Sequence, residues 1–185
     1  MREIALHILD IAENGIAAGA DTISILVNEA RKDNLLKLEI KDNGRGIPSN
    51  IFKNVTDPFS TTRTTRRVGM GLSLLKAAAL RCDGSFDIES EPGKGTKVSA
   101  GFRFDHIDRA PLGNMADSVM VLIAGHPDID FIYTHIIDEN DFVLDTSEIK
   151  KELEDIPITD SSIMLHLSEL IKNALKDIEL KGKMS

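Results

Sequence analysis

The segment DNGRGIP, residues 42–48, decides how the first half of this sequence folds. It carries too much glycine and proline for a regular element, so it marks a loop. Before it, apolar and polar residues alternate over residues 23–27 and again over residues 36–40, the pattern of two strands. The polar turn at residues 31–34 therefore predicts a β-hairpin whose second strand leads directly into the loop.

The loop itself has the composition of a base-binding turn. Asp42 stands at the strand end, where its carboxylate can accept a hydrogen bond from the exocyclic amine of adenine. Gly44 and Gly46 let the backbone pass close to a base because no side chain obstructs it. Thr96, which enters a later strand after Gly95, can help hold Asp42 or the base. Alone, this turn is more often an ordinary surface loop.

Upstream of the hairpin, residues 3–19 place apolar side chains at helical spacing and end at Gly19. Asp10 and Asn14 lie four residues apart in this helix, so they project from one face. A carboxylate at position 10 can orient or deprotonate a nucleophile. The amide oxygen of Asn14 can ligate a hard cation such as magnesium. Alone, such a pair is also typical of a solvated helix surface.

Downstream of the loop, residues 56–71 (TDPFSTTRTTRRVGMG) lack periodicity and predict a long loop. A helix over residues 72–81 and strands over residues 86–88 and 98–104 follow. Glycine-freed amides at a helix start bind phosphate, and arginine and threonine side chains add donors. The alternative for this segment alone is a flexible basic loop.

The order of these pieces resembles the ATP-binding domain shared by histidine kinases, gyrase, Hsp90 and mismatch-repair ATPases. Over residues 3–104, a helix with Asp-x-x-x-Asn and two strands precede DNGRGIP, DPFSTTR, GMGLSLLK and SEPGKGTKV. The resemblance implies an α/β fold, a two-layer α/β sandwich with helices on one face of a mixed, mostly antiparallel sheet. It also implies ATP and Mg²⁺ as ligands, with Asp10 in the catalytic role and Asn14 as the metal ligand.

The resemblance places the remaining site in the DNGRGIP loop and in a lid over the phosphates at residues 59–72. The residues it assigns to the nucleotide are Asn14, Asp42, Gly44, Gly46, Ile47, Phe59, Thr61, Thr62, Arg63, Arg67, Val68, Gly69, Met70, Gly71, Leu72 and Thr96.

Three positions depart from the family pattern. Asp10 stands where ATP-hydrolysing members usually have glutamate, which argues against vigorous hydrolysis. Arg67 stands where the kinase-type lid usually has glycine. Ala18 stands where gyrase B has the glutamate that pairs with its loop arginine, so we expect Arg45 to face solvent or to bind elsewhere.

The balance of basic and acidic residues changes near Phe104. Residues 1–104 carry 15 basic and 13 acidic groups, whereas residues 105–185 carry 7 basic and 17 acidic groups. We expect a histidine-kinase-like ATP-binding domain over residues 1–104 and a small acidic α+β C-terminal extension over residues 105–185. The acidic half would repel a phosphate backbone, so no nucleic acid is expected as a partner.

Within the extension, the pattern predicts a helix over residues 112–124 and a hairpin around residues 138–140. Thr146 and Asp160 are expected to cap two further helices. No apolar run is long enough to span a membrane. The single cysteine, Cys82, excludes an internal disulfide and favours a reducing cytoplasmic location.

The extension resembles that of small bacterial ATP-binding proteins, so we expect a stand-alone protein of this kind. None of the five histidines lies in the sequence context of the usual phospho-acceptor. The kinase-like lid favours a regulatory protein kinase, for Ser/Thr or His, that acts on a partner protein in signal transduction. A slow ATPase and a non-catalytic ATP-responsive switch remain open as alternatives, and so does a homodimer.

Overall fold

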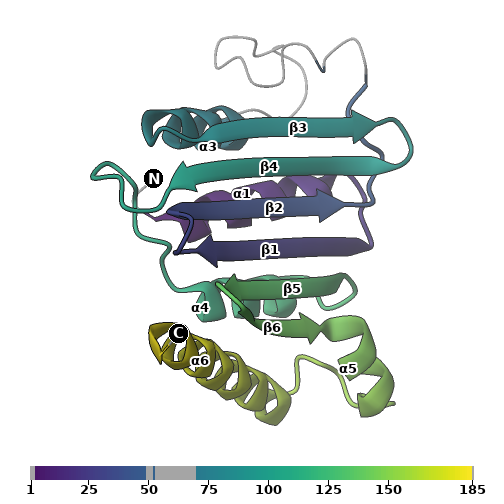
Figure 1. Ribbon diagram of the computed structural model, residues 1–185. Coiled ribbons are helices and arrows are strands. Elements are labelled where there is room, and N and C mark those ends of the chain that lie inside the picture. Colours follow the sequence, from purple (N-terminus) through teal and green to yellow (C-terminus); the bar gives the residue numbers. More distant parts are fainter. Residues whose placement is uncertain (1–2, 49–51, 53–69, 185) are drawn as a thin grey trace.

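The computed structural model describes residues 3–48, 52 and 70–184. Within these residues the centre is a six-stranded sheet with the strand order β3-β4-β2-β1-β5-β6 (Figure 1). Among the described strands only β1 and β5 run parallel, and the other neighbouring pairs are antiparallel. The strands are β1 (Thr22–Ala30), β2 (Leu35–Asp42), β3 (Ser85–Glu91), β4 (Gly95–Arg103), β5 (Asp130–Ile137) and β6 (Asn140–Asp145).

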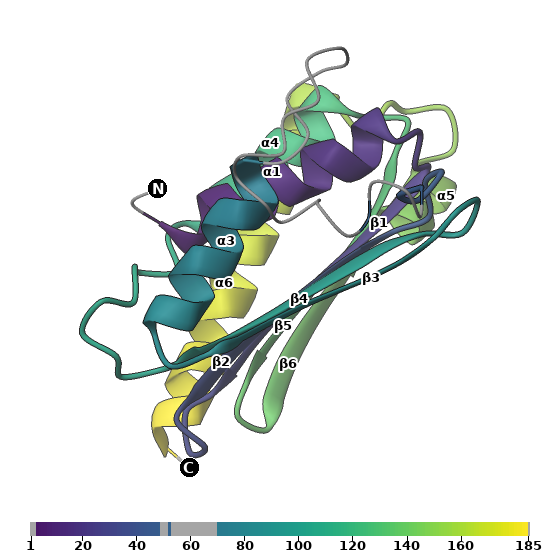
Figure 2. The ribbon, with the colours of Figure 1, turned by 90° about the horizontal axis from the view of Figure 1, so that it is seen from above.

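One face of the sheet carries the helical layer, as Figure 2 shows. Of the described helices, α1 (Ile4–Ala17), α3 (Met70–Arg81), α4 (Met115–Gly125) and α6 (Ser161–Met184) form this layer, and α5 (Thr146–Leu153) lies beyond the end of β6 (Figure 1). Alternate strand residues point into this layer and are buried, for example Ile23, Ile25 and Val27 of β1. The expected two-layer α/β sandwich is therefore confirmed.

The C-terminal stretch continues the sheet instead of standing apart from it. β5 pairs with β1 along its whole length, from Thr22 opposite Asp130 to Glu29 opposite Ile137. The segment between β4 and α4 also caps the N-terminus of α1. The amides of Ile4 and Ala5, which begin the helix, donate to the carbonyls of Pro111 and Leu112. One hydrophobic core therefore contains residues from both before and after position 104.

Two expected helix caps have different outcomes. Asp160 caps α6, since its carboxylate accepts from the Ser162 amide at 2.9 Å. The prediction for Thr146 was wrong: Asp145 caps α5 by accepting from the Ser147 amide at 2.8 Å. Thr146 is buried, and its hydroxyl accepts from the Phe131 amide of β5 at 2.8 Å instead.

Helix boundaries shift by a few residues from the sequence pattern. α4 begins at Met115, three residues later than expected, because the Asn114 side chain accepts from the Asp117 amide and starts the helix there. α3 begins at Met70, two residues earlier than expected. None of the described helices is both long and apolar enough to cross a membrane.

Candidate functional site

Asp42 stands where β2 ends, on the face that the helices cover. Leu36, Leu38 and Ile40 precede it at alternate positions and are buried on that face, so the strand aims its last carboxylate toward α1. The carboxylate Oδ1 accepts from the Gly44 amide at 2.9 Å. Burial raises the pKa of Asp42, although hydrogen bonds from the amides of Gly44 and Thr96 act in the opposite direction.

Helix α1 lies directly against Asp42 because residue 15 is a glycine. A Cβ atom on Gly15 would lie 2.8 Å from the Asp42 Cβ and 3.3 Å from its Oδ2. The helix therefore brings Asn14, the neighbouring half-buried residue, to the same end of β2. The loop after Asp42 packs on the end of the same helix, since a Cβ on Gly44 would lie 3.0 Å from the Ala18 Cβ.

The start of α3 meets α1 one turn before Asn14. A Cβ on Gly71 would lie 3.1 Å from the Asp10 Cβ and 3.5 Å from its Oδ2. Asp10 keeps its carboxylate accessible to solvent. Partial burial and the nearby Glu13 carboxylate raise the pKa of Asp10. Since proton acceptors work best when their pKa approaches the working pH, both effects suit a general base.

The first turn of α3 also carries no acidic residue. The amides that begin a helix have no partner within it, and the helix dipole makes that end positive. An anion at this end of α3 would lie close to Asp10.

The 42–48 loop is held by two side chains that the motif analysis did not single out. Asn43 accepts from the amides of Asp21 and Thr22 at 3.1 and 3.0 Å, so it ties the loop to the start of β1. Ser90 of β3 accepts from the Ile47 amide at 2.8 Å. Ser90 Oγ also lies 3.0 Å from the Gly95 carbonyl and 2.9 Å from the Thr96 hydroxyl.

Thr96 lies opposite Asp42 in the register of β2 and β4, and opposite Ser90 in the register of β3 and β4. It therefore supports Asp42 through its backbone amide and the 42–48 loop through Ser90. Arg45 is exposed, as expected from Ala18, and its amide donates to the Ala18 carbonyl at 3.1 Å.

The structure brings Asp10, Asn14, Asp42, Gly44 and Gly71 together around α1. The far part of the loop, Gly46 and Ile47, packs on the β3–β4 hairpin that carries Thr96. Leu72 is buried in the core. Met70 begins α3. The predicted lid residues Phe59, Thr61, Thr62, Arg63, Arg67, Val68 and Gly69 lie outside the described residues.

Of the missed residues, Gly15 and Ser90 had a signal in the sequence. Gly15 follows Asn14 directly inside a helix, where glycine is unfavourable and points to a close approach. Ser90 pairs with Thr96 once the two strands around residues 92–95 are read as a tight hairpin. Asn43 lies inside the quoted loop, and its polar side chain beside Asp42 gave no distinct signal.

A family model described as "Histidine kinase-, DNA gyrase B-, and HSP90-like ATPase" matches residues 2–106. The sensor histidine kinase YxdK of Bacillus subtilis is 44% identical over 69 residues, which cover 35% of this chain and 21% of that protein. Sporulation kinase D of the same organism is 30% identical over 92 residues, covering 50% of this chain and 18% of the kinase. The chain thus spans about a fifth of the length of these curated relatives.

Among solved structures, the ADP-bound MutL ATPase domain of Aquifex aeolicus superposes with a TM-score of 0.50 at 16% identity. The match covers 83% of this chain and 68% of that domain, and it shows a shared fold. Because the family model spans more than half of the sequence, the chain belongs to the family of histidine kinase-, DNA gyrase B- and HSP90-like ATPases.

Proposed function

We propose that this chain binds ATP with Mg²⁺ at the site formed by α1, the 42–48 loop and the start of α3. We further propose that it acts as a regulatory protein kinase on a partner protein. One observation carries the proposal. Gly15 lets α1 contact Asp42, and Gly71 lets α3 contact Asp10, so three motifs far apart in the sequence meet around one helix.

The adenine end of the site is the 42–48 loop. Asp42 is half-buried and accepts at Oδ1 from the Gly44 amide, and its Oδ2 would accept from the exocyclic amine of a base. Gly44 keeps the backbone beside the Asp42 carboxylate free of a side chain. Gly46 has a different role, because a Cβ there would collide with the Glu91 backbone of the β3–β4 hairpin. A guanine, which carries a carbonyl at the corresponding ring position, would meet the same carboxylate with repulsion.

The phosphate end lies between α1 and the start of α3. The free amides of α3 would bind phosphate oxygens, and Asn14 would contribute an amide oxygen to the cation. Among the described residues no group of three or more His, Cys, Asp or Glu side chains could hold a metal ion. This fits Mg²⁺ at a nucleotide, where most ligands come from water and phosphate, and where the cation neutralises phosphate charge.

In this proposal Asp10 acts on the attacking group. The hydroxyl or imidazole of the partner would give its proton to the Asp10 carboxylate as its oxygen or nitrogen bonds to the γ-phosphorus. The bond from that phosphorus to the bridging oxygen of ADP would break, and ADP would leave with the bond electrons. Phosphoryl transfer depends chiefly on positioning and electrostatics, which α1, the 42–48 loop and the start of α3 would supply in this proposal.

The kinase names of the relatives and the short reach of Asp10 support transfer to a partner over rapid hydrolysis. The lone, buried Cys82 supports a reducing location, and we place the protein in the cytoplasm.

The test uses ATP labelled at the γ-phosphate, with a soluble extract of the source cells as the pool of acceptors. A kinase labels an extract protein, and Asp10→Asn loses this labelling while calorimetry shows ATP still bound. Phosphate release without any acceptor would indicate an ATPase instead. Tight ATP binding with no product in either assay would indicate a switch. Unchanged ATP affinity in Asp42→Ala would contradict the site itself.

A further inference from the structure

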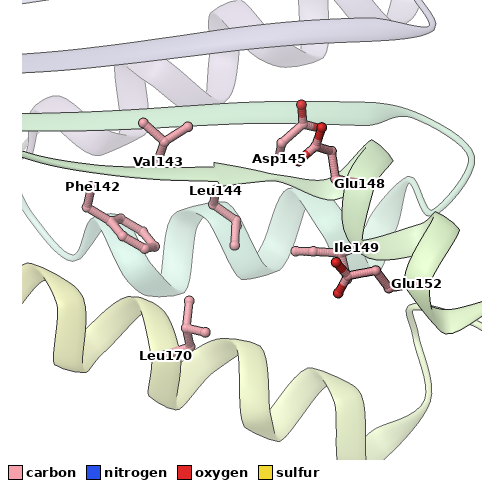
Figure 3. A pocket seen from close by; sticks show the side chains of 8 residues that line it. All are labelled: Phe142, Val143, Leu144, Asp145, Glu148, Ile149, Glu152 and Leu170. Carbon is pink, nitrogen blue, oxygen red and sulfur yellow. The ribbon is translucent and has the colours of Figure 1, made fainter.

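An open groove runs along the far edge of the sheet from the nucleotide site. It has a volume of about 500 Å³ and lies between β6, α5 and α6 (Figure 3). Phe142 and Leu144 point from β6 toward α6, and Leu170 points back toward them from α6. The residues that line it are Phe142, Val143, Leu144, Asp145, Glu148, Ile149, Glu152 and Leu170.

Leu170 departs from the pattern of its own helix. Leu167 and Ile171 of α6 are buried against the core, whereas Leu170 is 38% exposed beside the groove. Val143, at the middle of β6, is 52% exposed. Apolar side chains thus remain accessible on both sides of the edge strand.

β6 is an edge strand, with β5 as its one neighbour among the described strands. The amides and carbonyls on its outer side are therefore not used within the sheet. An edge strand beside an apolar hollow is the arrangement that accepts an added strand, because backbone hydrogen bonds give affinity and pockets receive alternate side chains.

The end of the groove next to α5 is acidic. Glu148 and Glu152 lie four residues apart on α5, so their side chains share a face, and both line the groove. Within the described part of the chain neither carboxylate forms an ion pair. The nearby Lys150 is engaged elsewhere, since its ammonium donates to the Asp130 carboxylate at 2.7 Å and to the Ile129 carbonyl at 2.8 Å.

These charges identify the occupant. A second copy of the chain would bring another strongly acidic surface to this edge, because residues 105–185 carry 17 acidic and only 7 basic groups. Like charges across an interface cost affinity. A segment carrying lysine or arginine beside the α5 end would instead pair with Glu148 and Glu152.

We propose that this groove binds an extended segment of a partner protein, added to β6 as a further strand. In that segment apolar side chains alternate toward Phe142, Leu144 and Leu170, and basic side chains flank them and contact Glu148 and Glu152. The surface is separate from the nucleotide site, so the proposal does not depend on the kinase assignment.

The test uses the full chain and the fluorescent peptide Lys-Lys-Val-Thr-Val-Thr-Val-Lys-Lys, followed by anisotropy. Saturable binding is expected, with none for the peptide whose lysines are replaced by glutamate. In an added strand alternate backbone amides face β6 and the others face away from it. Methylating the nitrogens that face β6 should abolish binding, and methylating the others should leave binding unchanged. Absence of binding up to about 1 mM, or equal binding of both charge versions, overturns the proposal.

The double variant Glu148→Lys with Glu152→Lys should bind the basic peptide at least about tenfold more weakly and should gain binding of the acidic one. Glu169→Lys makes the same kind of change on exposed α6, outside the groove, and should stay within about twofold of the wild type. Equal effects of the two changes overturn the proposal. A dimer in sedimentation that the double variant abolishes would show a second copy as the occupant and overturn it too.

Discussion

Gly15 of α1 faces Asp42 of β2 so closely that a Cβ atom on the glycine would lie 2.8 Å from the Asp42 Cβ. Real side chains do not approach to that distance, so either the helix or the carboxylate would have to shift. The absence of one methyl group therefore fixes how far α1 lies from the proposed adenine-binding carboxylate.

Replacing this glycine tests the relationship. Alanine usually stabilises a helix interior relative to glycine by about 1 kcal/mol. In Gly15→Ala we expect the added methyl to displace Asp42 and to weaken ATP binding at least about tenfold in calorimetry. Gly125→Ala is the matched control, because a Cβ there meets no atom within 4 Å and ATP affinity should not change. Equal affinities of the two variants would contradict this geometry.

Ser90 is expected to matter for stability although it lies behind the loop. Ser90→Ala leaves the Ile47 amide without the acceptor that it has at 2.8 Å. An unpaired, partly buried donor costs about 1–3 kcal/mol, so the urea midpoint should fall. Ser99→Ala changes a half-buried position of β4 that lies opposite Glu39 and Asp87, away from Ser90, and should have a smaller effect. A larger loss for Ser99 would contradict the role given to Ser90.

Because His7 is buried, we expect the free energy of unfolding to fall in acid. Burial lowers the pKa of His7 from 6.5 to about 4, and its Nδ1 has no partner among the described residues. Between those two values the unfolded chain binds a proton that the folded chain does not, so stability falls as pH falls from 6.5 to about 4. The loss amounts to at most about 3 kcal/mol.

Urea unfolding from pH 7 to pH 4 measures this loss of stability. His7→Leu, which cannot take up the proton, should show a flatter dependence on pH than the wild type. His166 is exposed on α6, and His166→Leu should keep the wild-type slope. If the free energy of unfolding of His7→Leu depends on pH as steeply as that of the wild type, another group causes the loss of stability in acid.

The hydrogen bond from the Phe131 amide to the Thr146 hydroxyl can be tested by substitution. Thr146→Val keeps the shape of this fully buried side chain but removes the acceptor of the Phe131 amide, so we expect a loss of about 1–3 kcal/mol. Thr134→Val, at a half-buried position of β5, should cost less. Asp145→Ala should weaken α5 by about 1 kcal/mol, as the loss of a cap does. A Thr146→Val protein as stable as the wild type would exclude the hydrogen bond.

The sequence predicted what depends on local patterns. Alternation gave β1 and β2 and their hairpin, and the glycine and proline of residues 42–48 gave the loop between β2 and the helical layer. Asp42 and Asp10 were found because their motifs occur in the order typical of the family. Asp10 lies on α1, and Asp42 packs against the same helix at Gly15.

What escaped prediction depends on pairs distant in the chain. The parallel pairing of β5 with β1 leaves no mark in either strand, because both alternate as any half-buried strand does. Thr146 and Asp145 are both good caps by residue type, and only the position of Phe131 in three dimensions decides between them. Leu170 fits the helical stripe of α6, and its exposure follows from where β6 ends the sheet.

The parallel pairing of β1 and β5 joins two strands that are synthesised far apart in time. Thr22 and Asp130 are neighbours in the sheet, so a ribosome makes β1 long before it makes the strand that completes it. Until β5 emerges, one side of β1 has open backbone groups and an apolar flank, which invite mispairing with other nascent chains. A chaperone that shields this strand for the duration of that delay would raise the yield of native protein, and a ribosome stalled before residue 130 would hold a chain unable to finish its sheet.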